Sequence, residues 1–391
     1  MNCQSTFLYV GTFDFRSNFG VAKRVGAIAL MLKELGYDAC FFDISFGNEF
    51  KCRPIEGGYC GFRVFEVGCQ RIKDTLRSIP EFDEFFNTVK DELLGIVYYH
   101  YYSWISRSLS NYSKMHDLLF LHDITEWYYP VLERNMRLPK AIIDYLIRWM
   151  DINISMRMLL KRSPSICISK RLAGYYSKKA LAVWIPFVSN QPCRNSYAPN
   201  DEPVFLSAIA SINLNARKER FDWVLRAVYD LMEEGIKFKL IVIGVTKDEA
   251  CSCFPLIEEK ILLCSENVLL FNGKIPNSEV LQQIEFADFC VFAREHNRRT
   301  DYGFPTKLSE SFSCATPVVT TPTSDISHFV LDGKTGFCAK SSTYEGFCDA
   351  FRKAAISTAE NRMAMHQNLK RDNPLEYSKW MPQLKEFFDS F

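Results

Sequence analysis

A lysine and a glutamate lie three residues apart near the start of one short predicted helix. The stretch Gly303–Thr321, GFPTKLSESFSCATPVVTT, has Pro305 at its first helical position, where a proline loses no hydrogen bond. Lys307 and Glu310 then share one helical face. The unpaired N–H groups of a helix start attract phosphate, and a carboxylate accepts hydrogen bonds from neighbouring hydroxyls. Phosphate beside a diol describes a nucleotide, although an exposed Lys–Glu pair would have the same spacing.

An arginine-rich loop precedes this helix. The segment DFCVFAREHNRRTDYGF is predicted to be a buried strand that opens into a polar loop with Arg294, Arg298 and Arg299. Loops at strand ends commonly carry binding residues, and arginine suits anionic oxygens. A charged loop exposed to solvent is the alternative. The loop is therefore a second candidate contact to an anionic ligand.

A third candidate group lies in the first half of the chain. The predicted strand in LFLHDITEWYYP ends with His122 and Asp123. Glu126 and Trp127 follow in the polar loop, and carboxylates beside aromatic rings are typical of sugar binding. A histidine here could orient a reacting hydroxyl or take its proton, and a hydrogen-bonded structural histidine is the alternative.

The residues between these groups predict the elements that position them. Short apolar strands alternate with amphipathic helices, which is typical of parallel sheets flanked by helices. A chain of 391 residues exceeds a comfortable single core, so we expect two α/β domains. The segment 185–203, rich in proline, asparagine and serine, is the best linker candidate. Ligands bind such sheets at the carboxyl ends of the strands, so we expect a cleft there.

The composition excludes several classes of protein. The net charge is +1, from 47 basic and 46 acidic residues, so we expect no nucleic-acid partner. The absence of a GxGxxG fingerprint removes the main support for a NAD- or FAD-dependent enzyme, and we expect no cofactor. The 14 cysteines form no CxxC pair or group at zinc spacing, which indicates free thiols and no metal site. With no signal-peptide pattern and no apolar run of about 18 residues, the expected location is cytoplasmic.

The longest amphipathic stretch covers roughly 139–162, and within it the segment 141–162 is apolar with arginine and lysine residues interspersed. Such a helix could lie on a membrane surface. A helix packed into the core of the first domain is the simpler interpretation. Peripheral contact with the inner face of a membrane stays open as the alternative.

The segment 303–337 resembles the donor-binding segment of the group 1, or family 4, retaining glycosyltransferases of bacterial surface polysaccharide synthesis. GFPTKLSESF corresponds to the family's GxPTKxxE pattern, and PVVTT follows in the place of its G.PVI. VWIPFVSN (183–190) and EYSKW (376–380) also have counterparts in that family.

The resemblance implies an α/β fold of the GT-B architecture, in which two Rossmann-like domains with parallel sheets face each other across a cleft. Residues 1–188 would form the acceptor-side domain, and 189–375 would bind the nucleotide sugar. Residues 376–391 would form a last helix that packs back on the first domain.

The resemblance also implies roles for individual residues. Glu310 would hold the ribose hydroxyls of the donor, and the backbone at the helix start would meet the diphosphate. Lys218 stands where the family places a lysine on the same diphosphate, although Arg217 directly precedes it, whereas the family's common pattern is R-x4-K. Gly20 opens the helix after the first loop, where the family keeps a glycine-containing loop. The donor-binding residues predicted in this way are Gly20, Arg217, Lys218, Arg294, Gly303, Pro305, Thr306, Lys307 and Glu310.

The family's E-x7-E pair is not intact, because Tyr302 stands eight residues before Glu310. The neighbouring Asp301 is the candidate replacement for the missing glutamate. Some relatives carry a histidine near the position of His122. The predicted catalytic residues are therefore His122, Asp123 and Asp301, and the predicted acceptor-binding residues are Glu126 and Trp127.

The implied activity is that of a retaining, metal-independent hexosyltransferase. It would move a sugar from a nucleotide-diphosphate donor, UDP-sugar by default, to a hydroxyl of a glycan or lipid-linked oligosaccharide. The product would be a capsule, exopolysaccharide or lipopolysaccharide precursor. No D-x-D triplet is present, so Lys, Arg and helix amides must neutralise the diphosphate. The alternatives are a nucleotide-sugar 2-epimerase, which shares the architecture, and a non-catalytic protein that binds nucleotide or glycan.

Overall fold

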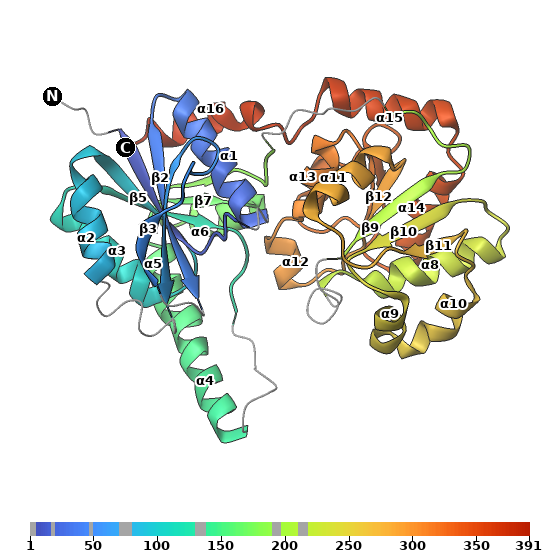
Figure 1. Ribbon diagram of the computed structural model, residues 1–391, viewed down its shortest axis with the longest axis horizontal. Coiled ribbons are helices and arrows are strands. Elements are labelled where there is room, and N and C mark those ends of the chain that lie inside the picture. The colour runs from blue at the N-terminus through green and yellow to red at the C-terminus, as the bar shows by residue number, and fades with distance from the viewer. Residues whose placement is uncertain are drawn as a thin grey trace. The chain divides into compact units, whose positions relative to one another are not determined.

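The computed structural model describes residues 5–16, 20–46, 50–69, 80–129, 138–189, 197–209 and 218–391. The chain divides into two compact units. Unit 1 comprises Met1–Val188 with Tyr377–Phe391, and unit 2 comprises Ser189–Glu376. Each unit is a sheet flanked by helices (Figure 1), which confirms the predicted α/β class with two parallel-sheet domains.

The sheet of unit 1 is parallel except at one edge, where β3 pairs antiparallel with β4 among the described strands. All six residues of β1, TFLYVG, are buried, which is typical of a central strand covered on both faces. The strands lie in the order β3 (Phe50–Pro54), β4 (Arg63–Cys69), β2 (Asp38–Phe46), β1 (Thr6–Gly11), β5 (Leu93–Tyr99), β6 (Leu119–Ile124), β7 (Ser165–Cys167) and β8 (Ala182–Trp184).

The helices of unit 1 include one from the C-terminal end of the chain. Phe388 of that helix packs on Phe7 of β1, with ring centroids 5.0 Å apart, and Trp380 lies edge-on to Trp184 of β8 at 4.9 Å. The helices are α1 (Gly20–Glu34), α2 (Pro80–Val89), α3 (Ser103–Met115), α4 (Leu138–Met150), the π-helical turn η2 (Asp151–Met156), α5 (Arg157–Leu160), α6 (Lys170–Tyr176) and α16 (Met381–Phe388).

The described strands of unit 2 are all parallel. They lie in the order β11 (Leu269–Phe271), β10 (Lys239–Ile243), β9 (Val204–Ala208), β12 (Phe289–Val291), β13 (Val318–Thr320) and β14 (Gly336–Cys338). The helices are α8 (Phe221–Glu233), α9 (Lys247–Cys253), α10 (Glu258–Leu263), α11 (Asn277–Phe286), α12 (Arg298–Tyr302), α13 (Thr306–Ser313), α14 (Tyr344–Ala355) and α15 (Ala359–Arg371).

The strand order of unit 2 reverses between β9 and β12. The chain builds outward from β9 through β10 to β11, and then returns to the other side of β9 with β12. The loops that leave β9 and β12 at their carboxyl ends therefore run in opposite directions. In open parallel sheets this point is where ligands bind.

The stretch 141–162 divides into two parts that differ in burial. In η2 and α5, Ile152, Met156 and Leu160 are buried, as the core-packed interpretation expects. Helix α4 instead projects away from the sheet of unit 1 (Figure 1), and the aliphatic side chains from Ile142 to Met150, together with Trp149, are exposed. The core-packed interpretation is therefore wrong for α4. The periodicity of an amphipathic helix indicates that one face is apolar, but it does not indicate what covers that face.

Candidate functional site

The switch point of unit 2 brings together two segments that are distant in the sequence. Arg294 follows β12, and Glu219 stands two residues before the start of α8. The two residues form an isolated antiparallel bridge, and the N–H of Arg220 donates to the carbonyl of Ala293 at 2.8 Å. The backbone therefore holds Glu219 and Arg294 side by side at the carboxyl ends of β9 and β12.

A buried carboxylate joins two of the predicted donor-binding cations. Arg294 Nη2 lies 3.2 Å from Glu219 Oε1, and Lys307 Nζ bonds Glu219 Oε2. Glu219 and Arg294 are only 8% and 4% exposed. Burial alone would raise the pKa of Glu219, but Lys307 and Arg294 outweigh it and lower that pKa below its usual value. We call Glu219, Arg294 and Lys307 the Glu219 cluster.

The Glu219 cluster holds two positive charges and one negative charge, and its guanidinium is not satisfied. Arg294 Nε and Nη1 are buried and meet no acceptor among the described residues. A buried charged N–H without an acceptor is costly. Burial also lowers the pKa of Arg294, which is the expected effect of a charge short of compensation. The net positive charge and the unsatisfied N–H groups of the Glu219 cluster therefore favour the binding of one further anion.

The backbone of Arg294 is fixed by neighbouring hydroxyl groups. The N–H of Arg294 donates to Thr321 Oγ1 at 2.8 Å, and that hydroxyl donates back to the Arg294 carbonyl at 2.6 Å. Ser342 Oγ donates to the same carbonyl at 2.6 Å. Because its main chain is held from two sides, Arg294 presents its guanidinium from a rigid position.

Helix α13 starts beside the cluster without a side-chain cap. Pro305 is the N-cap residue, one position earlier than predicted, and the first helical residue is Thr306. No described side chain caps this end. The first amides of α13 and the positive end of its dipole are therefore available to an anion. Lys307 lies in this first turn, and Glu310 is partly exposed one turn further on.

The loop between Arg294 and α13 is more ordered than a solvated charged loop. Asn297 caps the short helix α12, because its Oδ1 accepts from the amides of Arg299 and Thr300 at 2.9 and 3.0 Å. Asp301 bonds His296 Nδ1 at 2.7 Å. Asp301 thus has a local partner, and its proposed role in gripping the sugar stays a prediction.

The remaining predicted donor-binding residues lie outside the Glu219 cluster. Gly303 ends α12, where its N–H donates to the Arg299 carbonyl at 3.1 Å. Lys218 is partly exposed beside Glu219. Arg217 lies outside the described residues. Gly20 begins α1 in unit 1 and is not part of the cluster.

In unit 1, Asp123 is engaged in a closed ion pair. Its Oδ1 accepts from Arg24 Nη2 at 2.7 Å and from Nε at 3.1 Å. Arg24 Nη1 donates to the carbonyls of Ile185 and Pro186 at 3.2 and 3.0 Å. Burial alone would lower the pKa of Arg24, but Asp123 outweighs it and raises that pKa. We call this group the Arg24 cluster. Its contacts favour a structural role for Asp123 over proton transfer.

His122 is completely buried within β6, two residues before the strand ends. Its Nε2 lies 2.8 Å from Ser106 Oγ, while Nδ1 meets no partner among the described residues. Burial lowers the pKa of His122 to about 3, so the ring is neutral at physiological pH. These contacts favour the structural alternative, and a catalytic role for His122 stays a prediction.

The predicted acceptor-binding loop is partly filled by the chain itself. The Arg157 guanidinium lies 3.9 Å from the ring centroid of Trp127, and Tyr175 meets Trp127 edge-on at 5.0 Å. Trp127 is buried, whereas Glu126 is partly exposed. A sugar could stack on Trp127 only if Arg157 moved, so acceptor binding here is a prediction that no contact supports.

Glu219 was not predicted from the sequence. It stands between Lys218 and Arg220, and such an alternating run is typical of a solvated surface. Only its burial beneath two cations distinguishes it. A signal that could have found it is the position just before α8, at the carboxyl end of the first strand of unit 2.

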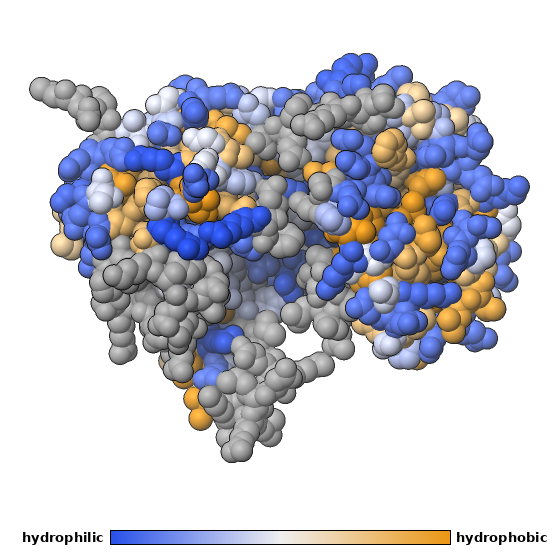
Figure 2. Space-filling model, in the orientation of Figure 1, coloured by the Kyte–Doolittle hydropathy of each residue, from blue (hydrophilic) through white to orange (hydrophobic). Residues whose placement is uncertain are grey.

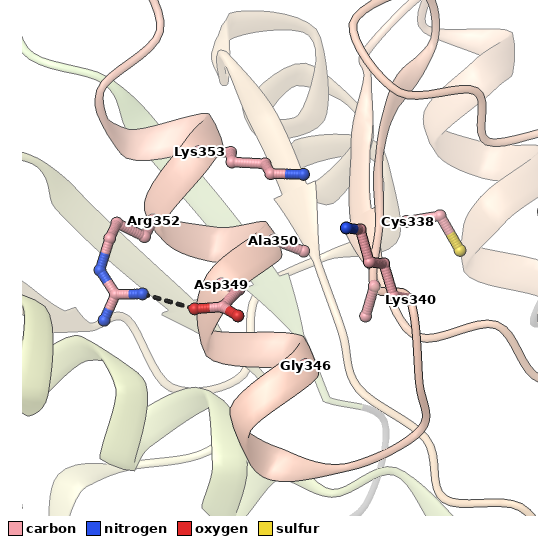
Figure 3. Close-up of a pocket in the computed structure, with 8 residues that line it drawn as sticks. Cys338, Lys340, Gly346, Asp349, Ala350, Arg352 and Lys353 are labelled. Carbon is pink, nitrogen blue, oxygen red and sulfur yellow. Dashed lines mark hydrogen bonds and ion pairs between the residues drawn. The ribbon is translucent and has the colours of Figure 1, made fainter.

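A pocket of about 230 Å³ lies elsewhere in unit 2, between β14 and α14 (Figure 3). Two of its charged side chains are paired with carboxylates: Arg352 with Glu234 and Asp349, and Lys353 with Asp332. Lys340, which also lines the pocket, is exposed to solvent. Among the described residues, the pocket therefore has no buried charge without an acceptor, unlike the Glu219 cluster. Within the described ranges, no three His, Cys, Asp or Glu side chains gather in a way that could hold a metal ion.

Comparisons with known proteins agree with this architecture. Residues 206–355 match the family model described as glycosyl transferases group 1. No curated protein sequence matches the chain. Sucrose-phosphate synthase from Thermosynechococcus elongatus is similar in structure, at 14% identity and a TM-score of 0.63, with 99% of this chain and 98% of that chain covered.

Two further similar structures were solved with nucleotide and sugar. Anabaena HepE in complex with UDP and glucose has 11% identity and a TM-score of 0.62, covering 99% of this chain and 100% of that chain. The pneumococcal O-GlcNAc transferase GtfA in complex with UDP and GlcNAc has 11% identity and a TM-score of 0.62, covering 99% of both. The chain therefore has the GT-B fold of two parallel-sheet domains and resembles the group 1 glycosyltransferases, with the sequence match carried by residues 206–355.

Proposed function

We propose that this protein is a retaining glycosyltransferase. It transfers a sugar from a nucleotide-diphosphate donor, UDP-sugar by default, to a hydroxyl of a glycan or lipid-linked acceptor in surface polysaccharide synthesis. The observation that carries the proposal is the Glu219 cluster at the uncapped start of α13, with buried Arg294 donors that meet no acceptor among the described residues. The group 1 match over residues 206–355 supports the same reaction class.

The cluster is suited to a leaving diphosphate. Lys307 and the first amides of α13 would bind its oxygens, and Arg294 would direct Nε and Nη1 toward them. Groups already held in place stabilise charge that develops as the bond to the sugar breaks. Glu310, one turn into α13, would accept hydrogen bonds from the ribose hydroxyls.

The proposed attack takes place on the face that the diphosphate leaves, which retains the configuration of the sugar. A departing phosphate oxygen would accept the proton of the acceptor hydroxyl, so no strong base from the protein is required. The neutral, buried His122 and the paired Asp123 are consistent with this scheme.

UDP is the proposed nucleotide, in line with the UDP complexes of HepE and GtfA. We also propose that charge neutralisation by Lys307, Arg294 and helix amides replaces a metal ion. Addition of EDTA is therefore expected to leave the affinity for UDP unchanged in titration calorimetry. A loss of binding that Mg²⁺ or Mn²⁺ restores would contradict metal independence.

The first experiment is thermal unfolding with UDP, GDP, ADP and dTDP, on the wild type, Glu310→Ala and the control Glu266→Ala. Glu266 is exposed in the loop between α10 and β11. At a hundred times its Kd, a nucleotide that binds only the folded protein stabilises it by about 2.7 kcal/mol. We expect one nucleotide to stabilise the wild type and Glu266→Ala, and to lose that effect in Glu310→Ala. The proposal would be wrong if no nucleotide stabilised the wild type, or if a nucleotide stabilised all three proteins equally.

Turnover distinguishes transfer from the alternatives. A 2-epimerase would convert the donor without an acceptor, and a non-catalytic protein would bind the nucleotide without consuming the donor. We expect donor consumption, followed as UDP release, to increase when acceptor glycans are added. Chromatography of the nucleotide sugars would reveal epimerisation directly.

A further inference from the structure

Helix α4 carries apolar side chains that the rest of the described chain leaves uncovered. Figure 2 shows hydrophobic side chains along α4 where the grey segments do not hide it. The apolar residues of α4 that are between 42% and 57% exposed are Ile142, Ile143, Leu146, Ile147, Trp149 and Met150. Ile154 and Met158 extend the exposed series beyond α4. A run of this kind on a water-facing helix marks an interaction surface.

The apolar and the charged side chains of α4 lie on opposite sides of the helix. At about 100° per residue, the six exposed apolar side chains fall within an arc of roughly 160°. Asp144 and Arg148 lie on the remaining side, and Arg148 is exposed. Trp149 lies at one margin of the apolar arc, where its amphipathic ring would meet an interface. Such a division is typical of a helix that lies in the plane of a membrane surface.

The charges favour an anionic surface. Residues 142–162 contain Arg148, Arg157, Lys161 and Arg162 against Asp144 and Asp151, which gives 4 − 2 = +2. Asp151 is bonded by Ser103 in unit 1, and the exposed residues among the cations are Arg148 and Arg162. Exposed cations on the segment that carries an apolar arc match anionic headgroups above an acyl layer.

The length of α4 sets its orientation. Its 13 residues give about 20 Å, whereas a bilayer core is about 30 Å thick. Among the described residues, no helix has both the length and the apolar character to cross a membrane. A helix of this length would therefore lie along the surface rather than span it.

We propose that α4 docks unit 1 on an anionic lipid bilayer, with its apolar arc in the boundary between headgroups and acyl chains. The inference rests on unit 1 alone, and the proposed donor chemistry rests on unit 2. Either can therefore fail without the other. Lipid binding would hold the protein at a surface where a lipid-linked acceptor is accessible.

The test is flotation of the full-length protein with vesicles of phosphatidylcholine, with and without phosphatidylglycerol. The variant is Ile143→Glu with Ile147→Glu, whose side chains are 57% and 55% exposed. The matched control is Leu262→Glu with Leu263→Glu in α10 of unit 2, both 57% exposed. We expect the wild type and the control to float with the anionic vesicles, and the α4 variant to partition at least tenfold more weakly.

Thermal unfolding of the α4 variant should match that of the wild type, because the substituted side chains are exposed. Failure of the wild type to float with anionic vesicles, or equal flotation of the α4 variant, overturns the proposal. Light scattering without lipid tests whether a second copy of the chain covers α4 instead. A dimeric wild type with a monomeric α4 variant would show that a second copy covers α4, and would also overturn the proposal.

Discussion

Each of the two units contains a buried ion cluster, and the two clusters differ in the number of guanidinium N–H groups that have no acceptor. In the Arg24 cluster every guanidinium nitrogen has an acceptor, and Arg24 and Asp123 are each about 1% exposed. In the Glu219 cluster, Arg294 is also buried, at 4% exposed, but two of its nitrogens meet no acceptor among the described residues. Removing charges from water is costly. We call a cluster saturated when each of its guanidinium nitrogens has an acceptor, and we interpret such a cluster as structural. An unsaturated cluster still has donors that a ligand can engage.

Unit 2 also holds a saturated cluster, so the difference is not one between units. Arg362 Nε bonds Asp288 Oδ1 at 2.8 Å, and its other nitrogens donate to the carbonyls of Ser357 and Asn200. Both side chains are nearly inaccessible. Saturation rather than burial therefore separates structural arginines from the one at the switch point. Four predictions test this distinction, from the largest expected effect to the smallest.

Arg24→Met should have the largest effect on stability. It leaves Asp123 buried without a partner, which is expected to lower the free energy of unfolding by about 3–5 kcal/mol. Urea unfolding followed by circular dichroism measures the loss. The double variant Arg24→Met with Asp123→Asn should recover part of it, because the unpaired charge is gone. A loss below about 1 kcal/mol in the single variant would show that the cluster is not structural.

Lys307→Met should chiefly weaken nucleotide binding. A charged hydrogen bond to the diphosphate is worth about 1.5–3 kcal/mol, so the Kd for UDP should rise roughly 10- to 150-fold. Titration calorimetry measures the change. Lys353→Met is the matched control, because Lys353 pairs with Asp332 away from the cluster. If both variants bind UDP equally well, the unsaturated cluster is not the diphosphate site.

His122 should make unfolding depend on pH. Its folded pKa of about 3 lies below the unfolded value of about 6.5, so the unfolded state binds more protons between them. This contribution to stability is present above pH 6.5 and decreases as the pH falls toward 3. From pH 7.5 to 5.5 the loss is about 1.4 kcal/mol.

Urea unfolding at the two pH values should show a shallower dependence in His122→Gln than in the wild type. The exposed His328 supplies the control variant His328→Gln, which should behave like the wild type. An unchanged dependence in His122→Gln would mean that the ring is not held neutral, and would restore it as a candidate acid or base.

Glu219→Gln should have the smallest effect and a diagnostic sign. The carboxylate competes with a diphosphate for Lys307 and Arg294, so its loss should tighten UDP binding by roughly fivefold, or about 1 kcal/mol. The unliganded protein should become less stable, because both cations lose their anion. Titration calorimetry and thermal unfolding check the two signs. Weaker UDP binding in Glu219→Gln would show that Glu219 positions the cations instead.

The predictable part of the site is local. Pro305, Lys307 and Glu310 lie within one helical turn and a half, so their spacing alone placed them at the start of one helix. Arg294 was predicted as a contact to an anion, but its burial and its unfilled donors were not. Asp301 was predicted as the replacement for the family's missing glutamate, and its pairing with His296 beside the capped turn of α12 was not predicted.

The partners of buried charges were not predictable. Asp123 lies 99 residues from Arg24, and Glu219 lies 88 residues from Lys307. The local sequence around either carboxylate does not indicate its partner, because the pairing depends on which strands become neighbours. The periodicity of 141–162 likewise could not distinguish a core helix from an exposed one.

The sequence by itself determined the α/β class, the two parallel sheets and the helix start with its lysine and glutamate. These follow from short-range patterns, because the strand period, the helix period and the helix-start residues act within a few positions. Only the tertiary structure decided which charges are saturated, which are not, and that α4 faces outward. Burial and pairing depend on segments that meet only after the chain has folded.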